Sequence, residues 1–155
     1  MTVLAIDQGT SATKALVVAD DGEVLSLAEA PITVVAAGDG AVEVDPEDLW
    51  SSVVTSATEA LAAAGNPRLQ AIGLANQGET VLAWDRATGA PAGRAIVWQD
   101  RRSESICERL REHGPFLAEH TGLELDPYFV APKVAWLRER VGDELTITTT
   151  DTWML

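Results

Sequence analysis

The residues most able to do chemistry lie near the amino terminus, where a short apolar run ends at a single carboxylate, Asp7. The segment after it contains a glycine and two hydroxyl residues: Gly9, Thr10 and Ser11. Magnesium prefers carboxylate and water oxygens, and phosphate prefers N–H and O–H donors. We therefore expect this corner to hold a phosphate tail and its ion. The alternative is a plain turn, because Asp and Gly are common turn formers.

A second polar segment, Asn76-Gln77-Gly78-Glu79, separates two apolar runs. Its amide and glycine residues are typical of a loop between strands. The Glu79 carboxylate can accept hydrogen bonds from two hydroxyls of a polyol or sugar. The alternative is that the segment is only a turn.

Aromatic residues mark two further candidate positions. The Trp98 ring ends an apolar run and can cover the C–H face of a sugar, while Gln99 and Asp100 beside it can meet hydroxyls. In the alternative, Trp98 covers the core, and Arg101 and Arg102 pair with local acids such as Glu104 and Glu108. Tyr128 lies in the turn Asp126-Pro127-Tyr128-Phe129, where its alternative role is to close a hydrophobic cluster.

The elements that must position these residues follow from hydrophobic spacing and turn residues. A strand before Asp7, a returning strand over 15–18 and a third strand over 23–35 predict an antiparallel meander, with a hairpin at 20–22 and a loop over 36–41. Asp45 and Pro46 predict the start of a helix that Gly65-Asn66-Pro67 ends. Further strands are expected over 69–74, 80–84, 95–98 and 145–150. A helix over 100–112 is expected to bury Ile106, Cys107 and Leu110. Further helices are expected between 114 and 122, from Pro132, and from Asp151. This order predicts a mixed α/β fold with all strands in one sheet.

Composition limits the function classes. The 155 residues suit a single domain with a packed core, and the formal charge of −13 argues against nucleic acid and anionic lipid as partners. We expect Cys107 to be a small buried residue, and His113 and His120 to interact with helix ends. No zinc pattern, Walker-type loop or nucleophile–base pair stands out.

Without a signal peptide or membrane-length apolar run, a soluble cytoplasmic protein is expected, and homo-oligomerisation is left open. Because exposed Trp, Met and Leu seldom end a domain, we expect the natural chain to continue beyond Leu155.

Six segments in this order resemble the amino-terminal region of FGGY-type carbohydrate kinases, and among these the glycerol kinases most. They are Ile-Asp-Gln-Gly-Thr-Ser (6–11), Val-Asp-Pro-Glu-Asp-Leu-Trp (44–50), Gly-Leu-Ala-Asn-Gln-Gly-Glu-Thr (73–80), Ala-Ile-Val-Trp-Gln-Asp-Arg-Arg (95–102), Asp-Pro-Tyr-Phe (126–129) and Asp-Thr-Trp (151–153). The resemblance implies an α/β fold of the ribonuclease H and actin-like ATPase type, with a mixed sheet and an amino-terminal antiparallel meander flanked by helices. It also implies transfer of the γ-phosphoryl group of ATP, with Mg2+, to a hydroxyl of a small polyol or sugar.

The resemblance also implies roles for individual residues. Asp7 matches the carboxylate near magnesium. The phosphate side matches Gly9, Thr10, Ser11 and Lys14, and the substrate side matches Gln77, Glu79, Trp98 and Tyr128. No residue here matches the proton-accepting aspartate or the adenine pocket, which in the family lie in the remainder of a longer chain. Residues 1–155 are then an incomplete amino-terminal domain, without the carboxyl-terminal ATP-binding domain, and this segment alone should lack turnover.

One departure from the glycerol kinase pattern concerns the substrate. Those kinases have an arginine where this chain has Gly78. Losing a charged donor that leaves a substrate oxygen unpaired costs about 1.5–3 kcal/mol, and the missing side chain leaves space for a larger polyol or sugar. Two alternatives to the kinase remain: a non-catalytic binding or regulatory module with the actin-like fold, and a plain α/β domain whose polar segments are only turns.

Overall fold

The computed structural model describes residues 2–155, which form two compact units. The first unit contains the residues up to Val34, residues 44–77 and residues 154–155. The second contains Val35–Glu43 and Gly78–Trp153. Each unit has its own sheet, so each is described by itself.

The first unit is built on a four-stranded sheet with the order β3-β2-β1-β6. Its strands are β1 (Val3–Gln8), β2 (Ala12–Val18), β3 (Val24–Pro31) and β6 (Ala71–Asn76). The first three pair antiparallel in chain order, which confirms the predicted meander, although the third strand ends at Pro31. Strand β6 pairs parallel to β1, so the sheet is mixed, as predicted.

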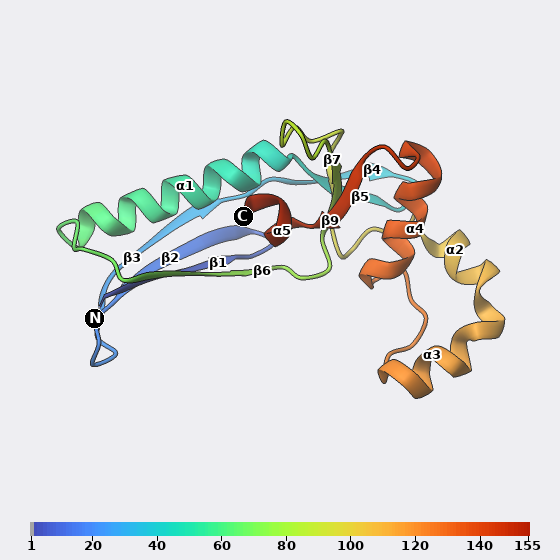
Figure 1. Ribbon diagram of the computed structural model, residues 1–155, viewed down its shortest axis with the longest axis horizontal. Helices are drawn as coiled ribbons and strands as arrows, with labels where there is room; N and C mark the ends of the chain where they lie inside the picture. The colour runs from blue at the N-terminus through green and yellow to red at the C-terminus, as the bar shows by residue number, and fades with distance from the viewer. Residues whose placement is uncertain (1) are drawn as a thin grey trace. The chain divides into compact units, whose positions relative to one another are not determined.

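Helix α1 (Pro46–Ala63) covers one face of this sheet (Figure 1). It begins as predicted, because the Asp45 carboxylate accepts a hydrogen bond from the Glu47 N–H at 3.0 Å. It ends before Gly65 and Asn66, whose φ values of 78° and 53° no longer continue a helix. Its apolar face packs on β1 and β2 around six buried residues: Leu4, Ile6, Ala15, Val17, Val53 and Ala60.

The second unit contains a separate five-stranded sheet with the order β4-β5-β8-β7-β9. Its strands are β4 (Val34–Gly38), β5 (Ala41–Val44), β7 (Val81–Trp84), β8 (Ala95–Ile96) and β9 (Thr146–Thr149). The prediction of a single sheet was therefore wrong, as was the loop over 36–41. Asp39 and Gly40 both have positive φ, which lets the chain reverse tightly and makes two short strands of that segment.

The helices of this part are α2 (Glu104–Arg109), the 3-10 turn η1 (Arg111–His113), α3 (Gly114–Thr121), α4 (Val130–Val141) and α5 (Thr150–Met154). The helix expected from Asp100 starts only at Glu104, because the Asp100 carboxylate binds the N–H groups of Val42 and Arg102 instead. Ile106 and Cys107 are buried as predicted. Leu110 is 39% exposed, so its predicted burial was wrong.

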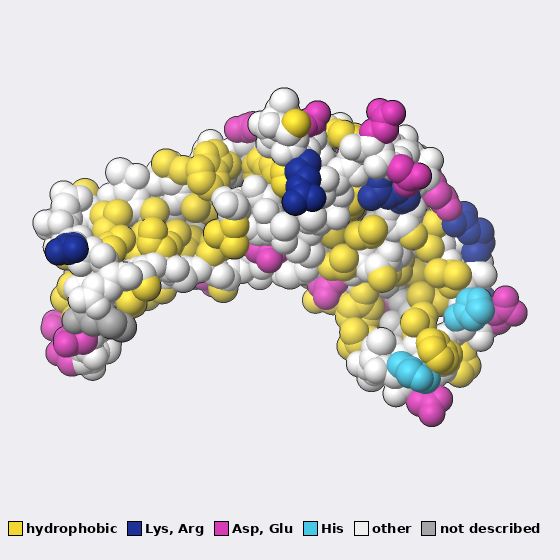
Figure 2. Space-filling model, in the orientation of Figure 1, with side chains coloured by type: hydrophobic (Ala, Val, Ile, Leu, Met, Phe, Trp, Pro, Cys, Tyr) yellow, Lys and Arg dark blue, Asp and Glu magenta, His cyan; other side chains and the backbone are white. Residues whose placement is uncertain are grey.

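Charged side chains are dispersed over the visible surface of the molecule, with no basic patch in view (Figure 2). Both histidines lie at helix ends as predicted, and His120 Nδ1 is 2.8 Å from the Phe116 carbonyl oxygen. Among residues 2–155, no helix is both long enough and apolar enough to cross a membrane.

Candidate functional site

The predicted phosphate corner is the short turn that joins β1 to β2. The Gly9 N–H donates to the Ala12 carbonyl at 3.1 Å, which closes the turn. A Cβ atom at Gly9 would lie 3.0 Å from that carbonyl oxygen, closer than side-chain atoms normally approach. The position therefore favours glycine, and Ser11 is exposed at the outer side of the turn.

Gln77 braces the same turn from the end of β6. Its amide Nε2 donates to the Gly9 carbonyl at 3.1 Å, and its Oε1 accepts from the Thr10 hydroxyl at 3.2 Å. The Gln77 backbone N–H donates to the Gln8 carbonyl at 3.0 Å. The structure thus brings Gln77 together with the predicted phosphate residues, although the sequence placed it with the substrate residues.

Asp7 lies at the end of the sheet face that α1 does not cover. Its alternating neighbours Ile6 and Gln8 are buried, whereas Asp7 is exposed. Lys14 on β2 is its direct cross-strand partner, and Glu29 on β3 follows in the same row. This row of alternating charges puts a lysine beside the carboxylate, an arrangement that also stabilises neighbouring strands.

Asp7 also decides whether the corner fits magnesium. Within residues 2–155 there is no group of three or more His, Cys, Asp or Glu side chains that could hold a metal ion. Magnesium often keeps several waters and is bound through one or two carboxylates together with substrate phosphates. One exposed carboxylate beside a hydroxyl-bearing turn fits that kind of site.

In the second unit, Glu79 is fixed by the first turn of α4. Its Oε2 accepts a hydrogen bond from the Val130 N–H at 2.6 Å, so the carboxylate acts as a remote cap on this helix. The cap explains why α4 begins at Val130, earlier than the predicted start at Pro132. The Glu79 side chain is only partly buried, so the carboxylate is not enclosed by the cap.

The Trp98 and Tyr128 rings lie against each other. Their centroids are 5.7 Å apart with an interplanar angle of 60°, and the Tyr128 ring meets Phe129 edge-on at 5.1 Å. Tyr128 is 42% exposed, so it does not close a buried cluster as the alternative supposed. Since Val130 follows Tyr128 closely, the structure brings three predicted substrate residues to the start of α4: Glu79, Trp98 and Tyr128.

Asp100 has a structural role that differs from the predicted contact with hydroxyls. It is 1% exposed, and its carboxylate accepts hydrogen bonds from the Val42 N–H at 2.8 Å and from the Arg102 guanidinium. Arg102 also pairs with Glu43 at 2.8 Å and lies over the Trp136 ring at 4.7 Å. This network anchors the loop that carries Trp98 against β5 and α4.

The predicted arginine pairs are correct in part. Arg101 pairs with Glu104, as expected, at 3.1 Å. It also lies 3.6 Å from the Asp126 carboxylate. Arg102 pairs with another local acid, Asp100, and also with Glu43, which is distant in sequence.

Lys133 is a residue that the sequence reasoning missed. It is fully buried in α4, and its ammonium donates to the carbonyls of Pro127, Tyr128 and Phe129. Burial lowers the pKa of Lys133 to about 8, against the opposing effect of carboxylates that include Glu79 and Asp100. The available signal was its spacing, because Lys133 falls among Val130, Val134 and Leu137 on the apolar face of the helix.

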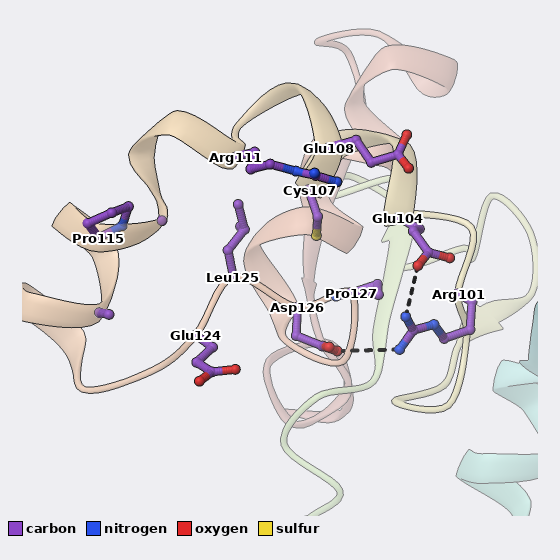
Figure 3. A pocket seen from close by; sticks show the side chains of 12 residues that line it. Arg101, Glu104, Cys107, Glu108, Arg111, Pro115, Glu124, Leu125, Asp126 and Pro127 are labelled. Carbon is purple, nitrogen blue, oxygen red and sulfur yellow. Dashed lines mark hydrogen bonds and ion pairs between the residues drawn. The ribbon is translucent and has the colours of Figure 1, made fainter.

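A cavity of about 470 Å³ lies between α2, α3 and the segment before α4 (Figure 3). Its described lining does not include Glu79, Trp98 or Tyr128, and its Arg101 is paired with Glu104 and Asp126. Cys107 also faces it, but burial raises the pKa of this thiol and so disfavours the nucleophilic thiolate. The cavity therefore borders the segment before Tyr128 through Asp126 and Pro127, but none of the three candidate substrate residues lines it.

Comparison with known proteins gives a consistent family. The model of the FGGY family of carbohydrate kinases, N-terminal domain, matches residues 2–154. Glycerol kinase of Methylobacterium nodulans is 45% identical over 165 aligned residues, which cover 99% of this chain and 33% of the relative. Glycerol kinase of Thermus brockianus is 44% identical over the same extent.

Solved structures agree with this match. The crystal structure of Plasmodium falciparum glycerol kinase with ADP superposes with a TM-score of 0.89 at 26% identity, covering 99% of this chain and 33% of that one. Xylulose kinase from Rhodospirillum rubrum has the same TM-score at 22% identity, which supports the fold alone. The chain thus spans about a third of the length of the relatives it matches, and its mixed α/β architecture is that of their actin-like ATPase fold. The chain belongs to the FGGY family of carbohydrate kinases, whose N-terminal domain it matches from residue 2 to residue 154.

Proposed function

We propose that this chain is the amino-terminal part of a cytoplasmic, ATP-dependent kinase that phosphorylates a hydroxyl of a small polyol or sugar. The observation that carries the proposal is the meeting of Glu79, Trp98 and Tyr128 at the start of α4. A carboxylate can accept hydrogen bonds from substrate hydroxyls, and an exposed pair of aromatic rings offers an apolar surface for the C–H groups. The similarity to glycerol kinases supports the same substrate class.

In this proposal the first unit holds the phosphate side. Asp7 would orient magnesium through a carboxylate oxygen or through water, and the turn of Gly9, Thr10 and Ser11 would face the phosphates with Lys14. Magnesium supplies charge neutralisation on the phosphoryl group when it is bound. Gln77 holds the turn in shape through its contacts with Gly9 and Thr10. The general base and the adenine site are proposed to lie in sequence beyond Leu155.

The direct test is an assay of the complete protein that contains this chain. We expect phosphorylation of at least one member of a panel comprising glycerol, xylulose and gluconate, with ATP and magnesium. Formation of ADP together with the phosphorylated product should be measured, and protein without magnesium is the control. A reading frame that stops at Leu155, or no product from any member of a broad polyol and sugar panel, would contradict the proposal.

Gly78 provides a test of substrate choice. A Cβ atom built there meets no atom within 4 Å, and its φ lies outside the left-handed region, so arginine fits without backbone strain. We expect Gly78→Arg to raise kcat/KM for glycerol by roughly 10–100-fold relative to larger substrates, because it restores a charged donor to a substrate oxygen. Steady-state kinetics with glycerol and xylulose measure this shift.

Two matched variants isolate the cause. Gly78→Ala adds the Cβ atom without the donor, and Gly93→Arg adds the same charge at another glycine with open space in the same unit. Neither should change the preference by more than about twofold. An equal preference in Gly78→Arg and Gly78→Ala would remove this position from substrate selection.

A further inference from the structure

The segment Pro127–Phe129 is held in place by the buried ammonium group of Lys133. Lys133 Nζ donates to the Pro127 carbonyl at 2.6 Å, to the Phe129 carbonyl at 3.4 Å and to the Tyr128 carbonyl between them. Three consecutive carbonyls that converge on one cation require the chain to curl around it. All three ammonium donors have acceptors in this segment.

Both polar groups of the Tyr128 backbone, the N–H and the carbonyl, are therefore hydrogen-bonded. Its N–H donates to the Asp126 carboxylate at 2.7 Å, and its carbonyl accepts from Lys133. The ammonium also lies 5.9 Å from the centroid of the Tyr128 ring, within the range of a cation–π contact. These contacts fix the backbone that carries the ring, which lies 5.7 Å from the Trp98 ring between centroids.

Glu79 is tied to the same turn of helix. Its carboxylate accepts a hydrogen bond from the N–H of Val130. Val130 follows this segment directly and begins the helix that carries Lys133. The helix start thus joins the ring of Tyr128 to the carboxylate of Glu79. Displacing the segment would move both groups relative to a bound substrate.

Burying a lysine in the first turns of a helix is unfavourable, so other contacts must stabilise its charge. The helix dipole disfavours a cation at this end, and burial lowers the pKa of Lys133 to about 8. The titratable groups that oppose this lowering come from four segments: the carboxylates of Glu79, Asp100 and Asp126, and the thiol of Cys107. At neutral pH the amine is therefore still mostly protonated and keeps its three donors.

We propose that Lys133 is the positioning residue of the alcohol subsite, which fixes Pro127–Phe129 so that Tyr128 and Glu79 meet the substrate together. The inference rests on the proposed function. In the complete protein, Lys133→Met should raise KM for the alcohol substrate roughly 10–100-fold while KM for ATP stays within about twofold. Lys133→Gln keeps two donors and should recover part of the loss.

Hydrogen exchange supplies a readout that does not need activity. Lys133→Met should speed amide exchange in the peptide covering residues 126–129, with Lys133→Gln intermediate. The matched control is Leu137→Ala, which opens a cavity one turn further along α4 and lowers stability; its cluster includes Val130 but none of residues 126–129, over which exchange is compared. It should leave both KM values and the local exchange unchanged at temperatures well below its unfolding transition.

The outcomes separate the two proposals. Unchanged exchange over 126–129, or equal loss in Lys133→Met and Leu137→Ala, overturns the positioning role. Failure of both Lys133 variants to fold also overturns it, in favour of a purely structural lysine. A complete protein that phosphorylates no substrate but shows the local loosening contradicts the proposed function and leaves the anchoring of the segment by Lys133 supported.

Discussion

Replacing Asp7 with asparagine is expected to lower turnover of the complete protein on the order of 10²–10³-fold with ATP and magnesium. Asparagine keeps the size of the side chain but loses the negative charge that orients the cation. The half-saturating magnesium concentration should rise in the same variant. Since Asp7 is exposed at the end of β1, the unfolding temperature should change little.

The control for Asp7→Asn is Glu29→Gln. Glu29 is also exposed, lies on the same face of the sheet, and belongs to the same cross-strand row as Asp7 and Lys14. The variant removes the same charge two strands away, and turnover should stay within about twofold of the unaltered protein. Equal losses in both variants would indicate a general effect of surface charge, and normal turnover in Asp7→Asn would remove Asp7 from the proposed role.

The parts of the fold that the sequence predicted well are those set by local signals. The meander follows from apolar runs joined by short turns, and helix α1 has both a cap at Asp45 and a stop at Gly65. Each of these signals acts within a few residues of the element it defines.

The division into two sheets could not be predicted in the same way. Strands β7 and β8 are as apolar as β6, and nothing in their residues states which strand will pair with them. Strand partners are chosen by long-range packing. The hairpin of β4 and β5 was missed because glycines at positions 38 and 40 are equally typical of a loop.

The candidate site shows the same limit. Glu79, Trp98 and Tyr128 could each be singled out by residue type, but their meeting at the start of α4 depends on contacts between segments far apart in sequence. The two possibilities for Asp100 could not be separated, because a carboxylate after a strand looks identical whether it faces a ligand or binds a partly buried arginine. The sequence does contain a local signal for Lys133, because a charged residue on the apolar face of a helix indicates a buried charge.

Replacing Glu79 is expected to lower kcat/KM for the alcohol substrate by roughly 10²–10³-fold, because two charge-assisted hydrogen bonds to hydroxyls are lost. The structure gives this carboxylate a second role, the cap on the Val130 N–H at 2.6 Å. Glu79→Gln retains an oxygen that can accept from that N–H, whereas Glu79→Ala removes it. Both variants should lose activity, but only Glu79→Ala should lose about 1 kcal/mol of unfolding free energy.

The matched control is Asp45→Ala, which removes a comparable cap from α1 in the other unit. It should lower stability about as much as Glu79→Ala while leaving kcat/KM within about twofold. Urea unfolding measured beside steady-state kinetics on the three variants separates capping from substrate binding. If Glu79→Gln were fully active, the carboxylate would be a helix cap alone, and Trp98 and Tyr128 would need another partner to bind a hydroxylated substrate.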